Sequence, residues 1–234
     1  MSPKKRVIII ICVFIVTSII VNLTIIAYNG GFSNGNLVTS TGSKNLWKAG
    51  KNIKPGDFMV YELQTKDNQN NTQNRIVNIS FYDKANEYWN TRFIISNQTG
   101  NIINFVENLS KSNLLVKDPD ERNKEYFKEI ETTILSIRDV TREQKYLVIG
   151  AQWDTISSGV STIPLKITSN QDIETPIGKV NVYVLNYRIN NTNNNILISE
   201  KFPLPIKADI HDEEGKILFK YLIKKTNIKS SLNT

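Results

Sequence analysis

Few residues in this sequence are of the types that perform catalysis or bind metals. The 234 residues include one histidine and one cysteine, which excludes a cysteine-rich zinc module and leaves little room for histidine-based metal or triad chemistry. His211 stands beside the acidic turn Asp212–Gly215, a pattern typical of an ordinary surface histidine. We therefore expect no catalytic, metal-binding or cofactor-binding residues. Paired carboxylates of the glycosidase type remain an open alternative, because the fold rather than the sequence sets their spacing.

Carboxylates near residue 120 could either bind calcium or begin a helix. Asp118 is a good N-cap, Pro119 suits the first helical position, and Glu121 completes a capping box. Because the helix dipole already favours negative charge at this end, we expect a helix rather than a calcium site. The apolar residues that follow at helical spacing are Phe127, Ile130, Ile134 and Ile137. This stripe predicts one helix of about 18–20 residues.

Three tryptophans could line a groove or pack in a core, and packing is the commoner role. They are Trp47, Trp89 and Trp153. A groove between two of them and the helix stripe would suit a hydrophobic ligand. The candidate groove residues are Trp89, Trp153, Phe127, Ile130 and Ile134.

The N-x-[ST] glycosylation pattern occurs about as often as chance allows in a chain so rich in Asn, Ser and Thr. Three of these sites fall in expected turns, where a glycan could be attached if this part of the chain is exported. The candidates are Asn70, Asn97 and Asn190.

Residues 7–27 form an uncharged run of 21 residues, about 31 Å long as a helix and therefore able to cross a bilayer. A cleaved signal peptide is the main alternative, and a buried core helix is a weaker one. The apolar run exceeds the about 7–15 residues of a signal peptide, and the exit Ile25–Tyr28 has no small-x-small cleavage pattern. We expect an uncleaved single-pass signal-anchor that contacts the lipid bilayer.

The charges flanking this run predict its orientation. Lys4, Lys5 and Arg6 precede it, and the next charge is Lys44, so the N-terminus should be cytoplasmic and the C-terminal domain outside. Without these three N-terminal basic residues, the rest of the chain has 26 of the 29 basic residues and 22 acidic residues. Because these charges are scattered, we expect no nucleic-acid partner.

Composition divides the chain into five parts. A cytoplasmic stub (1–6) and the transmembrane segment (7–27) precede a flexible linker (28–46) rich in Gly, Asn, Ser and Thr. A β-rich extracytoplasmic domain (47–226) follows, and a polar tail (227–234) ends the chain.

Most of the β-rich domain alternates as strands do, with about ten strands separated by turn signals. The expected strands are 58–63, 75–81, 88–95, 102–106, 145–149, 163–167, 179–187, 196–201, 205–210 and 216–223. Pro164 suggests an edge, whereas 179–187 has two apolar faces and should be central. We predict a mainly β fold in which a curved antiparallel sheet, a half-barrel, packs on one long helix. The runner-up is a two-sheet sandwich.

The C-terminal third resembles envelope proteins of the lipoprotein-carrier type, and also membrane-anchored archaeal surface proteins of unknown function. The segments that carry this resemblance are Glu174–Gly178, Asn195–Ser199 and Phe202–Lys207, with Val148–Gly150 and Trp153 before them. The resemblance implies an open half-barrel holding a helix and, in the carriers, a cavity for acyl chains. An uncleaved anchor departs from the carrier pattern, because a tethered protein does not shuttle between membranes.

These observations favour a membrane-anchored extracytoplasmic binding domain, whose partner is a hydrophobic ligand such as a lipid or an envelope protein. The alternative is a structural or interaction module of the envelope without a ligand cavity. An extracellular hydrolase is a third hypothesis.

Overall fold

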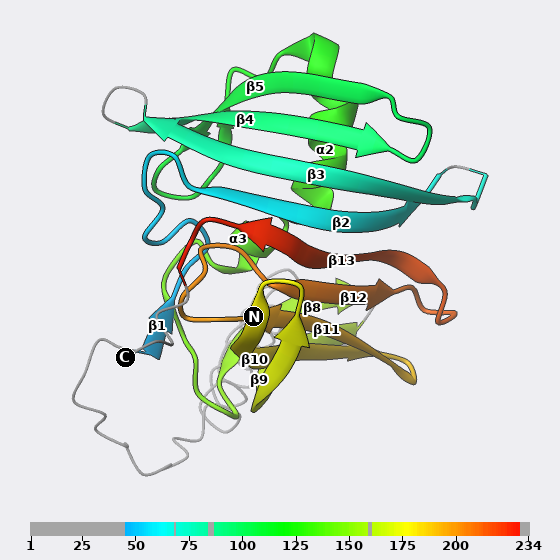
Figure 1. Cartoon of the computed structure of the whole chain (residues 1–234). Coiled ribbons are helices and arrows are strands. Elements are labelled where there is room, and N and C mark those ends of the chain that lie inside the picture. Colours follow the sequence, from blue (N-terminus) through cyan, green and yellow to red (C-terminus); the bar gives the residue numbers. More distant parts are fainter. Residues whose placement is uncertain (1–44, 68, 84–86, 159–160, 230–234) are drawn as a thin grey trace, which may run out of the picture. The chain divides into compact units, whose positions relative to one another are not determined.

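The computed structural model describes residues 45–67, 69–83, 87–158 and 161–229 (Figure 1). The expected stub and anchor, nearly all of the linker, and residues 230–234 of the tail lie outside these ranges. Among the described residues, no helix is both long and apolar enough to cross a membrane.

The described chain is mainly β, and eleven of its strands form one curved antiparallel sheet, as the sequence predicts. The first meander contains β2 (Phe58–Lys66), β3 (Thr72–Asp83), β4 (Tyr88–Asn97), β5 (Ile102–Ser110) and β6 (Val116–Lys117). The second contains β8 (Gln152–Ser158), β9 (Ser161–Thr175), β10 (Gly178–Ile189), β11 (Thr192–Ile198), β12 (Lys207–His211) and β13 (Ile217–Thr226). A separate pair joins β1 (Leu46–Trp47) to β7 (Lys145–Tyr146).

The two meanders meet where β2 pairs with β13, so that strands from opposite ends of the domain lie side by side (Figure 1). Tyr221 lies opposite Leu63 in this register. The hydroxyl of the neighbouring Tyr61 donates to the Pro205 carbonyl at 3.0 Å. Through this junction the two meanders form one continuous sheet rather than a two-sheet sandwich.

The prediction of one long helix beginning at residue 118 is wrong. The chain forms a 3-10 turn, η2 (Glu121–Asn123), then α2 (Lys124–Thr132) and the short α3 (Ile137–Val140). Asp120 rather than Asp118 provides the N-terminal cap, and its side chain accepts from the Arg122 amide at 3.0 Å. The Thr133 hydroxyl donates to the Glu129 carbonyl, and such bonds from β-branched residues compete with helix continuation.

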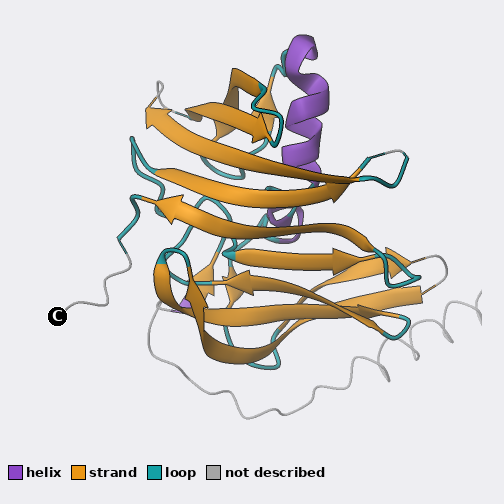
Figure 2. Cartoon of the chain, turned by 45° about the vertical axis from the view of Figure 1, so that its right-hand side comes forward, coloured by secondary structure: helices purple, strands orange, loops and turns teal. Residues whose placement is uncertain are grey.

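Helix α2 covers one face of β2–β5, which we call the helix face (Figure 2). The Phe127 ring meets the Phe93 ring of β4 edge-on, with centroids 5.6 Å apart. Ile134 is fully buried although it lies in the turn after α2. The apolar stripe therefore contacts the sheet as predicted, across a break in the helix.

Several strand predictions between residues 145 and 175 need correction. The expected strand 145–149 is only the short β7, and the neighbouring β8 was missed. Pro164 was expected on an edge strand but lies on β9, between β8 and β10. It pairs with Thr155 of β8, and the pairing of β9 with β10 begins only at Lys166. The strand predicted to be central, β10, does lie between β9 and β11.

Candidate functional site

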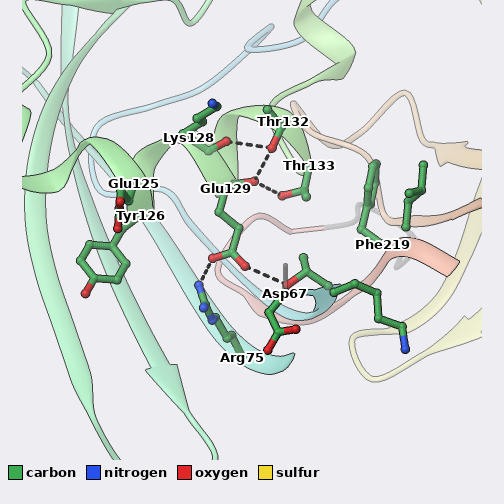
Figure 3. A pocket seen from close by; sticks show the side chains of 12 residues that line it. Asp67, Arg75, Glu125, Tyr126, Lys128, Glu129, Thr132, Thr133 and Phe219 are labelled. Atoms are coloured by element: carbon green, nitrogen blue, oxygen red, sulfur yellow. Dashed lines mark hydrogen bonds and ion pairs between the residues drawn. The ribbon is translucent and has the colours of Figure 1, made fainter. Parts of the chain in front are cut away.

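A surface hollow of about 520 Å³ lies between α2 and the sheet at the ends of β2, β3 and β13. We call it the α2 groove (Figure 3). Its lining residues are Thr65, Lys66, Asp67, Arg75, Glu125, Tyr126, Lys128, Glu129, Thr132, Thr133, Leu218 and Phe219.

The helix contributes to the groove through the face next to its apolar stripe. Tyr126, Glu129 and Thr133 line the groove, and each immediately precedes a residue of the buried stripe in the sequence. One residue corresponds to a rotation of about 100° in a helix with 3.6 residues per turn. Burying the stripe against the sheet therefore turns the preceding residues toward the hollow.

An ion pair between Arg75 of β3 and Glu129 of α2 occupies the groove (Figure 3). The two side chains are 24% and 17% exposed, so both are largely withdrawn from water. The Thr65 hydroxyl of β2 donates to the same carboxylate at 2.9 Å. Burial lowers the pKa of Arg75, and the nearby Tyr126 acts in the opposite direction. One carboxylate thus links the helix to two strands.

The β2–β3 hairpin forms one rim of the groove. The Asp67 carboxylate accepts from the Asn71 amide at 2.8 Å and the Gln69 amide at 2.9 Å. These backbone bonds, the one from Asn71 foremost, lower the pKa of Asp67. Lys66 donates to the Thr72 hydroxyl at 3.0 Å. The charged groups of this rim therefore hold the hairpin in shape.

The residues predicted to line a ligand groove are all buried. Trp89 belongs to β4 and Trp153 to β8, and seven strands separate these two in the sheet. Trp153 stacks on Trp47, with ring centroids 5.9 Å apart. Phe127, Ile130 and Ile134 pack in the core beneath α2. A ligand role for these five residues stays a prediction.

No sequence pattern identifies Arg75, Glu129 or Tyr126 as site residues. Arg75 and Glu129 are 54 positions apart, and neither belongs to a motif. Only the register of β3 against β2 and the position of α2 bring them together. The pair can therefore be identified only from the folded structure.

The other face of the sheet has two adjoining hollows, of about 420 and 410 Å³. Both are lined by Lys207 and Leu222. Among the described residues, no group of three His, Cys, Asp or Glu could hold a metal ion. His211 lies 3.5 Å from Asp209, and its amide donates to the buried Asn194.

The three candidate glycosylation sites lie in or next to turns. Asn70 and Asn190 are exposed and adopt positive φ angles, of 65° and 51°. The Asn97 side-chain oxygen accepts from the Thr99 and Asn101 amides. The Asn190 side-chain nitrogen donates to the Glu213 carbonyl at 3.2 Å. Glycosylation of these residues stays a prediction.

No family model and no curated protein matches the chain. One similar solved structure is that of a Bacteroides fragilis protein described as exported and having a YmcC-like fold. Its sequence is 8% identical and the TM-score is 0.36. The match covers 79% of this chain and 99% of that one. MucB has 10% identity and TM-score 0.39, covering 76% of this chain. MucB in the Pseudomonas aeruginosa MucA/MucB complex has 11% identity and TM-score 0.36, covering 73%. The chain spans 55% and 51% of these two MucB chains. Similarities this low transfer no function to the chain.

Proposed function

We propose that this protein is a membrane-tethered, outward-facing binding domain that takes a polar ligand in the α2 groove. The observation that carries this proposal is the separation of two faces of α2. The apolar stripe is buried, while the face beside it lines an open hollow with charged and hydroxyl groups.

The buried stripe argues against an acyl-chain cavity in the helix face. Phe127 is 3% exposed, and Ile130, Ile134 and Leu135 are fully buried. A close-packed core of this kind has no room for a further chain without moving α2. An acyl chain also needs an apolar lining, whereas half of the twelve groove residues carry a charge.

The α2 groove has the properties of a site for a small polar molecule. Its volume of about 520 Å³ falls within the range of about 300–1,000 Å³ that is usual for ligand pockets. The ion pair and the Thr65 hydrogen bond hold its polar groups in place before a ligand arrives. Such preorganisation reduces the entropic cost of binding.

The outward orientation rests on the sequence. The basic residues 4–6 on one side of the apolar run, and the absence of charge as far as Lys44 on the other, favour a cytoplasmic N-terminus. The lone cysteine, Cys12, falls inside the apolar run. The domain therefore contains no thiol that an oxidising compartment could modify.

Native mass spectrometry of the full chain in lipid nanodiscs tests the proposal. The chain is incubated separately with the lipid fraction and the water-soluble fraction of the source envelope. We expect a mass adduct from the water-soluble fraction, and its loss in the Thr132→Trp variant, in which an indole fills the groove. Lys220→Trp, on the other face of the sheet, is the matched control and should keep the adduct.

A mass adduct only from the lipid fraction, unaffected by Thr132→Trp, would contradict the proposal in favour of a lipid carrier. No adduct from either fraction would favour the alternative, an envelope interaction module without a small ligand.

A further inference from the structure

We propose that the ligand of the α2 groove is an uncharged carbohydrate. This inference rests on the proposed function and names the ligand class for the same site. It follows from the charge balance of the lining, from the kind of hydrogen-bonding groups present, and from the two aromatic side chains at the walls.

The charges that line the groove cancel. Lys66, Arg75 and Lys128 are opposed by an equal number of carboxylates, those of Asp67, Glu125 and Glu129. A phosphate, a sulfate or a strongly acidic sugar would meet as much repulsion as attraction there. A neutral ligand avoids both this repulsion and the cost of burying a net charge.

The polar groups of the groove match hydroxyl groups. A hydroxyl both donates and accepts, so it can bridge a guanidinium and a carboxylate that already lie side by side. Arg75 carries planar donors and Glu129 carries paired acceptors, and the two form an ion pair within the lining. Thr132 and Thr133 add hydroxyl oxygens that can accept a hydrogen bond, since their protons are donated to the Lys128 and Glu129 carbonyls. Adjacent hydroxyls on a sugar ring present this alternation of donors and acceptors.

Aromatic rings occupy two sides of the polar centre. Tyr126 from α2 and Phe219 from β13 lie on opposite sides of the Arg75–Glu129 pair (Figure 3). Phe219 is held by stacking on Tyr221, with ring centroids 6.2 Å apart and planes 5° apart. The C–H face of a sugar ring is apolar and packs on such side chains, while its hydroxyl edge needs a polar partner.

An extended peptide fits this groove less well. Peptides that bind along sheets gain affinity from main-chain hydrogen bonds to a free strand edge. The three strands that line the groove have a paired neighbour on each side, β3 between β4 and β2, and β13 between β2 and β12. The groove therefore offers side chains rather than a strand edge, which suits a sugar better than a polypeptide.

Binding of the full chain in nanodiscs to three kinds of probe tests this inference. The probes are an array of neutral oligosaccharides of glucose, galactose and N-acetylglucosamine, an acidic oligosaccharide of galacturonic acid, and a pool of polar peptides. We expect binding to at least one neutral probe, weakened at least about tenfold by Tyr126→Ala. Tyr82→Ala removes a tyrosine that is 47% exposed on β3 and does not line the groove, so its affinity should match the wild type.

Circular dichroism and thermal melting of both variants establish that they fold. A neutral probe whose affinity falls equally in both variants would overturn the assignment to this groove. The carbohydrate inference is also overturned if only the acidic probe or the peptides bind, or if no probe binds at millimolar concentration. In those cases, the proposed function would still be supported if the mass adduct from the water-soluble fraction forms with the wild type and is lost in Thr132→Trp.

Discussion

The Thr65 hydroxyl of β2 donates a hydrogen bond of 2.9 Å to the Glu129 carboxylate of α2. The same carboxylate forms an ion pair with Arg75 of β3, so a single acidic side chain connects the helix to two neighbouring strands. Its burial makes the arrangement more rigid than an exposed surface pair would be. This connection lies at the polar centre of the α2 groove.

Replacing Glu129 should therefore weaken the fold. The Glu129→Gln variant keeps the side-chain volume but leaves the largely buried Arg75 without its counter-charge. We expect a loss of about 1–2 kcal/mol in the free energy of unfolding, between the values for exposed and fully buried pairs. Urea unfolding of the full chain in mild detergent measures this loss. Glu125→Gln on the exposed side of the same helix should stay within about 0.5 kcal/mol of the wild type, and equal losses in both variants would contradict the connection.

Removing the Phe127 ring should have a larger effect. Phe127 packs edge-on against Phe93 and is buried beneath α2. The Phe127→Ala variant leaves a cavity, and such substitutions cost about 3–5 kcal/mol. The exposed neighbour Lys128 is the control, since Lys128→Ala should change stability by less than about 0.5 kcal/mol. A cost below about 1 kcal/mol for Phe127→Ala would mean that the helix stripe is not part of a packed core.

The stability of the domain should depend on the ionisation of Glu107. This side chain of β5 is 3% exposed, and its Oε1 atom has no hydrogen-bond partner among the residues that the structure describes. Burial raises the pKa of Glu107, and the backbone amide of Asp120 opposes this shift. The folded state thus favours the protonated form. Its contribution to stability is fully present below the unfolded pKa of about 4.3 and is lost as pH rises through the raised folded pKa.

Comparing the wild type with Glu107→Gln from pH 4 to pH 8 checks this dependence. We expect the unfolding free energy of the wild type to fall relative to that of the variant as pH increases over this range. Parallel pH profiles for the two proteins would show that Glu107 is not the group responsible.

The predicted topology can be tested by labelling cysteines in intact cells. Gln98 is exposed in the β4–β5 hairpin, so a membrane-impermeant maleimide should label the Gln98→Cys variant. The native Cys12 falls in the expected anchor and should not react until the membrane is dissolved. Labelling of Gln98→Cys only after cell lysis would reverse the predicted orientation.

The sequence predicts local features of this fold well because those features depend on neighbouring residues. Alternation marks β2 to β5, and the two apolar faces of 179–187 identify β10 as a central strand. The break after α2 was missed because the apolar spacing of Ile134 and Ile137 continues through it. There, hydrogen bonds from the Thr132 and Thr133 hydroxyls to carbonyls of the preceding turn accompany the end of the helix.

Long-range features could not be predicted in this way. The β2–β13 junction joins strands more than 150 positions apart, as Leu63 and Tyr221 show. The Arg75–Glu129 pair depends on that sheet and on the rotation of α2. The stripe is correctly predicted to be apolar, but residues outside it, such as Tyr126 and Glu129, line the groove.

Hydrogen exchange of the full chain in nanodiscs tests whether the α2 groove is the binding site. The chain is compared with and without the water-soluble fraction of the source envelope, and peptides covering 62–76, 123–133 and 216–220 report on the groove. We expect exchange to slow in these three segments and not in 152–158 of β8. Slower exchange confined to other parts of the sheet, with the groove segments unchanged, would contradict the assignment of the α2 groove as the binding site.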